Sequence, residues 1–237
     1  MGQARSHVFA PLGDLGRAEA VTARLTDAIS MGLLADGEQL PSEAELAGQF
    51  GVATVTVREA LVALRQQGLV ATRRGRGGGS FVIAPGEGEP ASWQQRLRRV
   101  SLSELRDIGD HYLAVAGAAA RLAAERSSPE DVERLRLATE DLRKADGQAA
   151  ARAERQFHLE MAAAAQSPRL THQEIQLQGE QGGLLWLPPS ANAHAEHRAI
   201  TEAIAHQDGE LARKLTEEHI LEAVDRLVDM HLELLDP

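Results

Sequence analysis

The chain has 237 residues, a formal net charge of −10, only 3% aromatic residues and no cysteine. The lack of cysteine excludes disulfides and thiolate metal sites, and no apolar run approaches the ~18 residues that a membrane-spanning helix needs. We therefore expect a cytoplasmic protein with no membrane partner, and the length suits two modest domains.

The negative charge is unevenly distributed along the chain. Residues 1–83 contain eight arginines, no lysine and eight acidic residues, whereas the remainder contains 17 basic and 27 acidic residues. An acidic body repels DNA and a local group of arginines attracts it. Any DNA binding is therefore expected on one face of the first part.

The first part begins with helical signals. Apolar residues recur at helical spacing from Arg17 to Leu34. Ser42, followed three residues later by Glu45, predicts a capping box at the start of a short second helix, and Gly51 predicts its end. A third helix is expected from Val52 to Gln67, and Gly68 stops it.

The third helix is followed by signals for a β-hairpin. Two β-prone pieces, Leu69–Thr72 and Ser80–Ile83, flank a tip of arginine and glycine, and the Pro/Gly-rich stretch "PGEGEPAS" then ends the domain. Helix, turn, helix and hairpin is the layout of a winged helix-turn-helix, which places one helix in the DNA major groove. We expect a flexible arm at 1–16, this domain at 17–84 and a linker at 85–94.

The start of the third helix carries the residues suited to reading bases. The run from Ala53 to Thr56 is small enough for a close approach, and a valine or threonine methyl can touch a thymine methyl. Arg58, one turn further, can reach guanine or phosphate. Alone, Arg58 beside Glu59 would indicate a solvated ion pair, but the cap, turn and wing around it favour DNA binding.

The second part shows only helical signals, so we expect an all-α bundle at 95–237 and a mainly α protein overall. The breaks fall at "SSPED", "KADGQ", "QSPRL", "LPPSAN" and "HQDGE". Trp186 is interpreted as the anchor of a helix end rather than as a lid over a site. The expected helices are 95–100, 102–126, 129–145, 149–165, 168–186, 192–206 and 209–234.

Four residues of the second part stand out from the background. Glu154 and His158 are four apart and therefore share one helix face. His197 and His219 each lie eleven residues from Asp208, the centre of the break between the last two helices. In an antiparallel hairpin the two imidazoles are then level with each other, because the rise per residue is the same on both sides.

Three imidazoles and one carboxylate suit a borderline divalent ion with open coordination positions. Zinc is expected first, with nickel, manganese and iron as alternatives. The competing interpretation is that these are ordinary core or surface histidines, since the chain contains nine. The shared geometry favours the metal site, whose open positions could accept a carboxylate ligand.

The first part resembles the DNA-binding domain of the GntR family of bacterial transcription regulators. The resemblance rests on "LPSEAELA", "FGV", "TVREAL" and the glycine-rich wing ending in "SFV". The family often has arginine where this chain has Ala44 and Thr54. The DNA-binding residues that the resemblance and the wing tip imply are Thr54, Thr56, Arg58, Arg73, Arg74, Gly75, Arg76 and Gly77.

The second part resembles the all-helical FCD ligand-binding domain of the FadR subfamily, through "LAAERSSPEDVERL", "FH", "EHRAITEAI" and "GELARKLTEEHI". In that family the metal carboxylate is usually aspartate at the position of Glu154. Members also commonly carry arginine and glutamate where this chain has Tyr112 and Ala116. The resemblance implies an effector pocket at the metal, with Tyr112 as a candidate contact.

Two functions are weighed. The first is a homodimeric transcription regulator, expected to be a repressor, that binds an inverted-repeat operator and responds to a small organic acid at a metal-containing helical pocket. The second is a metal-dependent hydrolase with an appended DNA-binding module. Metal-dependent hydrolysis requires a general base beside the metal-bound water. Glu196 and Glu218 directly precede His197 and His219, but neighbouring side chains on a helix point about 100° apart, so neither is well placed as that base. The regulator is favoured.

Overall fold

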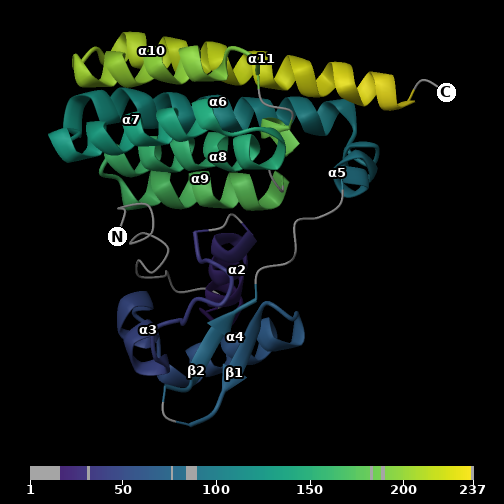
Figure 1. Ribbon diagram of the computed structural model, residues 1–237, viewed down its shortest axis with the longest axis vertical. Helices are drawn as coiled ribbons and strands as arrows, with labels where there is room; N and C mark the ends of the chain where they lie inside the picture. Colours follow the sequence, from purple (N-terminus) through teal and green to yellow (C-terminus); the bar gives the residue numbers. More distant parts are fainter. Residues whose placement is uncertain are drawn as a thin grey trace. The chain divides into compact units, whose positions relative to one another are not determined.

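The computed structural model describes residues 17–30, 33–75, 77–83, 90–181, 184–187 and 190–235. The chain divides near residue 87 into two compact units, an N-terminal unit and a helical unit. The arm expected at 1–16 and the linker residues 85–89 lie outside the described part. The expected fold class is confirmed, because helices dominate and the described strands form one two-stranded hairpin (Figure 1).

The N-terminal unit contains three described helices, α2 (Arg17–Ser30), α3 (Glu43–Phe50) and α4 (Thr54–Gln66). Ser42 caps α3 in the predicted capping box, in which the Glu45 side chain accepts a hydrogen bond from the backbone of Ser42. Gly51 ends α3 with a φ of 67°, a left-handed conformation that favours glycine. These caps confirm the turn expected between α3 and α4.

The hairpin pairs β1 (Val70–Arg73) with β2 (Gly79–Val82) in antiparallel register, with Val70 opposite Val82. Gln39 adds an isolated bridge to Phe81, so the segment before α3 lies along β2. The inner faces of the helices and hairpin bury one small core. Its members include Leu25, Leu46, Phe50, Leu61, Leu64 and Val82.

The helical unit is built from long helices stacked in layers, with α10 and α11 side by side at one side of the stack and α9 at the other (Figure 1). Contacts join α6 to α11, α7 to α8, and α10 to both α7 and α11. The described helices are α5 (Pro90–Leu97), α6 (Leu102–Arg126), α7 (Pro129–Lys144), α8 (Gly147–Ala164), α9 (Pro168–Gln181), α10 (Ala193–Ala205) and α11 (Gly209–Leu235).

Helices α6 and α11 pack especially closely, and a glycine makes this approach feasible. A Cβ added to Gly109 of α6 would lie 2.8 Å from Cγ2 of Val224 on α11. Real Cβ atoms do not tolerate such a contact, so the glycine sets the distance between the two helices.

Several helix boundaries differ from the sequence-based expectation; α2, for example, ends at Ser30 and not at Leu34. Helix α5 begins at Pro90, five residues earlier than expected and inside the predicted linker, as suits proline in the first turn of a helix. Helix α9 ends at Gln181, and Leu184–Trp186 form a separate 3-10 turn instead of continuing it. Among the described helices, none is both long and apolar enough to cross a membrane.

Candidate DNA interface and metal centre

Helix α4 turns one face into the core of the N-terminal unit and the other to solvent. Val57, Leu61 and Leu64 are buried, which leaves Thr54 exposed and Thr56 half-buried on the first turn. Val55 is 57% exposed. This turn therefore offers hydroxyl and methyl groups of the kind that contact base edges.

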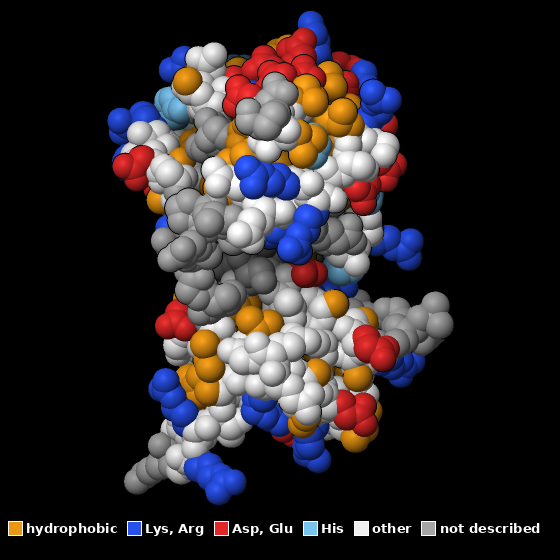
Figure 2. All heavy atoms as spheres, turned by 90° about the vertical axis from the view of Figure 1, so that its right-hand side faces the viewer, with side chains coloured by type: hydrophobic (Ala, Val, Ile, Leu, Met, Phe, Trp, Pro, Cys, Tyr) orange, Lys and Arg blue, Asp and Glu red, His pale blue; other side chains and the backbone are white. Residues whose placement is uncertain are grey.

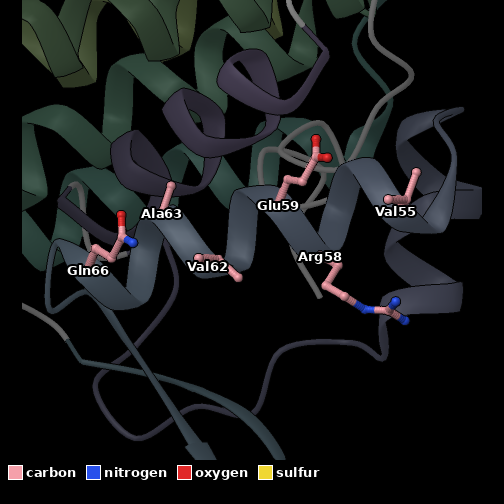
Figure 3. A pocket seen from close by; sticks show the side chains of 6 residues that line it. All are labelled: Val55, Arg58, Glu59, Val62, Ala63 and Gln66. Carbon is pink, nitrogen blue, oxygen red and sulfur yellow. The ribbon is translucent and has the colours of Figure 1, made fainter.

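Arg58 extends from α4 toward α3 (Figure 3). Its Nε and Nη2 atoms donate to Oε2 of Glu43 on α3, at 3.1 and 2.8 Å. The partner is therefore Glu43 and not Glu59, the neighbour in sequence that the solvated-pair interpretation used. Both side chains remain substantially exposed, so the guanidinium is oriented but accessible.

A groove runs between the start of α3, helix α4 and the wing, and it brings part of the predicted DNA-binding set together. Arg58 and Arg74 both line it, as do Arg65 and Thr72. Arg73 is engaged differently, because its guanidinium lies 4.3 Å from the centre of the Phe81 ring in a cation–π contact. Thr54 and Thr56 are not among the lining residues of this groove.

The wing tip depends on glycine. Gly75 and Gly77 have φ angles of 102° and 83°, and the amide of Gly78 donates to the carbonyl of Gly75 at 2.8 Å. Such positive φ angles are unfavourable for other residues, so glycine permits the tight tip and a close backbone approach to a ligand. Arg76 lies outside the described residues. Basic side chains gather at this end of the N-terminal unit (Figure 2).

The four residues singled out in the second part converge inside the helical unit. Glu154 and His158 come from α8, His197 from α10 and His219 from α11. One ligand atom from each lies within 4.8 Å of the others, and all four residues are buried. Side chains from three helices therefore meet at one buried point.

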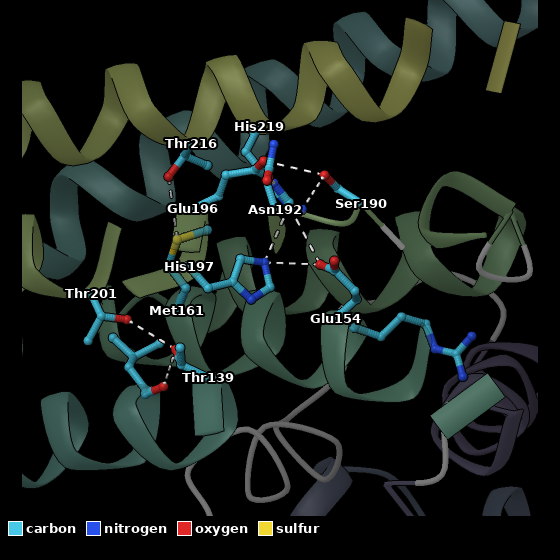
Figure 4. Close-up of polar contacts among 12 residues, drawn as sticks. Thr139, Glu154, Met161, Ser190, Asn192, Glu196, His197, Thr201, Thr216 and His219 are labelled. Atoms are coloured by element: carbon cyan, nitrogen blue, oxygen red, sulfur yellow. Dashed lines mark hydrogen bonds and ion pairs between the residues drawn. The ribbon is translucent and has the colours of Figure 1, made fainter. Parts of the chain in front are cut away.

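The closest contacts in this cluster join nitrogen and oxygen atoms that would face a shared ion (Figure 4). Nε2 of His197 lies 3.0 Å from Oε2 of Glu154 and 3.3 Å from Nε2 of His219. Nε2 of His219 lies 3.6 Å from the same carboxylate oxygen. The level placement of the two histidines, expected from their equal distances to Asp208, is confirmed by these contacts.

The hydrogen bonding of the cluster fits a cation. Both carboxylate oxygens of Glu154 and both ring nitrogens of His158 are buried without a hydrogen-bond partner in the described part of the chain, although His197 approaches Glu154 at ion-pair distance. Buried polar atoms without partners are costly, at roughly 1–3 kcal/mol each. One ion could bind one ligand atom from each of the four residues, and this donor set suits zinc and its neighbours.

The surroundings of the cluster favour the protonation states in which most of its side chains can bind a metal ion. Burial lowers the pKa of His158 well below its usual value and also lowers the pKa of His197, so both imidazoles are neutral. Burial would raise the pKa of Glu154, but the nearby histidines hold it well below its usual range. Burial would lower the pKa of His219, yet the nearby carboxylates of Glu154 and Glu196 raise it to about 9.

Aromatic rings surround the cluster. Phe157 stacks on His197 with ring centres 3.8 Å apart, and Trp186 stacks on His158 at 4.2 Å. Tyr112 meets the edge of Trp186 at 5.6 Å and is itself buried. Trp186 therefore packs against a candidate metal ligand, which corrects its interpretation as only the anchor of a helix end. Tyr112 contacts Trp186 and so lies one ring farther from the cluster than Trp186 does.

Sequence reasoning also missed a contact of Glu196. Its Oε2 lies 2.6 Å from Nδ1 of His219, on the far side of that ring from the cluster. Neighbouring side chains on a helix point about 100° apart, which separates Glu196 from His197 but does not exclude a contact with His219 on α11. The sequence signal that could have found this contact is that Glu196 directly precedes His197, the residue that lies level with His219.

Models of two known families match the chain. The model described as "Bacterial regulatory proteins, gntR family" matches residues 17–81, and the FCD domain model matches residues 107–222. The first spans the winged helix-turn-helix, and the second includes all four residues of the buried cluster.

The chain is similar over most of its length to known transcriptional regulators. RmpR of Mycobacterium gastri, described as an HTH-type transcriptional regulator, is 42% identical over 238 residues, covering 97% of this chain and 87% of that protein. An L-lactate dehydrogenase operon regulatory protein of Escherichia coli is 29% identical over 207 residues, covering 78% and 76%. The structure of E. coli McbR/YncC shares the fold, with a TM-score of 0.53 at 21% identity over 91% of this chain and 99% of that one.

Proposed function

The chain belongs to the gntR family of bacterial regulatory proteins and carries an FCD domain, and from this premise we propose that it is a repressor controlled by a small organic acid. It is a transcription regulator and not an enzyme, as its family and relatives are, which removes the hydrolase alternative. We propose that it acts in the cytoplasm, where bacterial DNA is accessible.

The observation that supports this proposal most directly is the buried convergence of one carboxylate and three imidazoles in the FCD domain. Glu154, His158, His197 and His219 would hold one divalent ion, with zinc first and nickel, manganese or iron as alternatives. When bound, the ion supplies a Lewis-acid centre for the carboxylate of an effector. Tyr112 borders the same region through Trp186 and is proposed as an effector contact.

In the N-terminal unit, we assign base reading to Thr54, Thr56 and Arg58 on the exposed face of α4. Two-fold symmetric regulators place one such helix in each half-site of an inverted repeat, so a homodimer is proposed. The residues proposed to approach the DNA backbone from the wing are Arg73, Arg74, Gly75, Arg76 and Gly77, of which Arg76 lies outside the described part.

The effector class rests on chemistry and on one relative. A buried divalent ion held by three imidazoles and one carboxylate favours an anionic, oxygen-rich ligand over an apolar one. The E. coli relative is named for an L-lactate dehydrogenase operon, and lactate is a small hydroxy acid. A small carboxylate or hydroxy acid is therefore the class to test first.

The test is operator binding with and without metal. An operator would be selected from random duplexes, and its affinity measured by fluorescence anisotropy for zinc-loaded and chelated protein against a panel of small mono- and dicarboxylates. We expect at least one acid to release the operator from the zinc-loaded protein only. Equal release of the operator from zinc-loaded and chelated protein would contradict the proposed role of the metal. The dimer is tested separately by light scattering, and a monomer that binds the operator tightly at 1:1 would contradict it.

A further inference from the structure

Glu196 lies beside the metal-binding cluster but outside it. It precedes His197 on α10, and its Oε2 atom lies 2.6 Å from Nδ1 of His219 on α11 (Figure 4). The hydroxyl of Ser190 lies 3.4 Å from Oε1 of the same carboxylate and accepts a hydrogen bond from the backbone amide of Asn192 at 3.1 Å. Glu196 is thus held at the edge of the cluster by contacts on both oxygens.

The two nitrogens of His219 point in different directions. Nδ1 is bound to Glu196, whereas Nε2 faces Nε2 of His197 at 3.3 Å and the carboxylate of Glu154 at 3.6 Å. A carboxylate accepts hydrogen bonds, so in the neutral imidazole, the form that binds a metal, this contact places the ring hydrogen on Nδ1 and leaves the Nε2 lone pair directed into the cluster.

The other two imidazoles lack such a contact in the described part of the chain. Both nitrogens of His158 and Nδ1 of His197 are buried there without a hydrogen-bond partner. These rings are instead held by stacking, His197 on Phe157 and His158 on Trp186. His219 is therefore the imidazole whose orientation depends on a specific polar neighbour.

We propose that Glu196 is a positioning residue of the metal centre, which fixes the orientation and tautomer of His219 so that Nε2 binds the ion. The inference rests on the proposed function, because it presupposes a metal at the four-residue cluster. Carboxylates in this outer position typically change metal affinity by about 10–100-fold when removed. Since Glu196 also adjoins His197, helix α10 supplies one ligand directly and orients a second on α11.

Two other roles of Glu196 are disfavoured by the geometry. It is not one of the converging ligands, because the cluster consists of Glu154 and the three histidines. It is also poorly placed as a base for ion-bound water, since the His219 ring lies between its carboxylate and the converging donors. Orientation of His219 is the role that remains.

The test compares Glu196→Ala and Glu196→Gln with Glu218→Ala in the full-length protein. Glu218 is a matched control: it is exposed, adjoins His219 in sequence, carries the same charge and lies 3.8 Å from the ammonium of the exposed Lys214. Zinc affinity would be measured by competition with a chromophoric chelator, and the His219 tautomer by nitrogen-15 NMR of the zinc-loaded protein.

We expect Glu196→Ala to weaken zinc binding about 10–100-fold and to change the nitrogen-15 signals of His219, since its Nδ1–H loses its acceptor. Glu196→Gln should have a smaller effect, since its amide oxygen still accepts a hydrogen bond, and it also serves if the alanine variant folds poorly. Glu218→Ala should match the wild type within about 2-fold.

Three results would overturn the inference. Unchanged zinc affinity and tautomer in both Glu196 variants would refute the positioning role while leaving the metal site intact. Loss of one ligand from the visible spectrum of the cobalt-loaded Glu196→Ala protein, with His219 still bound to the ion through Nε2 by NMR, would make Glu196 a direct ligand instead. A wild-type protein that binds no zinc would contradict the proposed function and the positioning role together.

Discussion

His197 on α10 and His219 on α11 place their Nε2 atoms 3.3 Å apart, although 22 residues separate them in sequence. The two helices run antiparallel from the turn at Asp208, so residues at equal distances from that turn become neighbours. Both imidazoles are buried, and each also faces Glu154. This pair connects the last two helices to α8 and is the core of the candidate metal centre.

Metal removal should destabilise the helical unit and leave DNA binding largely intact. An ion that binds only the folded state at 100 times its Kd adds about 2.7 kcal/mol of stability. The two tryptophans, Trp93 and Trp186, both lie in the helical unit, so their fluorescence reports its melting. We expect chelation to lower this melting temperature and resupplied zinc to restore it. An unchanged melting curve would argue against an ion that bridges three helices.

Arg58 and Arg74 should contribute to operator binding in different ways. Arg58→Ala should reduce operator affinity and relax the base preference at one position, because a bidentate Arg–guanine contact contributes about 1–3 kcal/mol of discrimination. Arg74→Ala, in the wing, should weaken binding to operator and scrambled duplex alike and reduce the salt slope by about one unit. Anisotropy titrations at several salt concentrations decide, and an Arg58→Ala protein with wild-type affinity for both duplexes would refute the major-groove assignment.

Glu174 of α9 should make the helical unit less stable as pH rises. It is fully buried, receives a hydrogen bond from Gln178 at 2.7 Å, and burial raises its pKa to about 7. A raised pKa means that the folded state holds the proton more tightly, so its contribution is fully present below the unfolded pKa. That contribution is lost as pH rises through about 7, by on the order of 3 kcal/mol in total.

Glu174→Gln mimics the protonated carboxyl and should remove this pH dependence. Denaturant unfolding followed by tryptophan fluorescence should therefore show the variant gaining stability over the wild type between about pH 5 and 8. The exposed Glu222→Gln serves as the control, with the wild-type profile expected. Parallel profiles for Glu174→Gln and wild type would show that Glu174 ionises at an ordinary pH.

Gly109 and Val224 should be energetically coupled. Gly109→Ala should destabilise the helical unit, because its Cβ would lie 2.8 Å from the stiff Val224 side chain and overpacking costs about 1–3 kcal/mol. In a Val224→Ala background the same substitution should become stabilising, by up to about 1 kcal/mol, since alanine favours helix over glycine. Equal effects of Gly109→Ala in both backgrounds, measured by denaturant unfolding, would rule out the close contact.

Much of this architecture could be predicted from local signals. The Ser42–Glu45 capping box and the left-handed Gly51 depend on backbone geometry within a few residues, so the sequence determines them directly. The alignment of His197 with His219 was predictable for a similar reason, because a tight turn fixes the register of the two helices that it joins.

Features that depend on distant contacts could not be predicted. Arg58 pairs with Glu43, fifteen residues away, rather than with the adjacent Glu59, because α3 brings Glu43 to the exposed face of α4. The contact of Glu196 with His219 and the stacking of Trp186 on His158 likewise depend on how helices pack. A single sequence gives the faces of helices but not the partners across them.

The central claim is that Glu154, His158, His197 and His219 together hold a divalent ion. The most direct test is the metal content of purified protein, resupplied with zinc and freed of excess, for the wild type and the His197→Ala, His219→Ala double variant. His206→Ala is the control, since His206 is exposed and its Nδ1 bonds to the carbonyl of Glu202 at the end of its own helix. We predict about one ion per chain in wild type and control and almost none in the double variant. A double variant that retains the wild-type content, or a wild type that holds no zinc, nickel or manganese, would contradict the account.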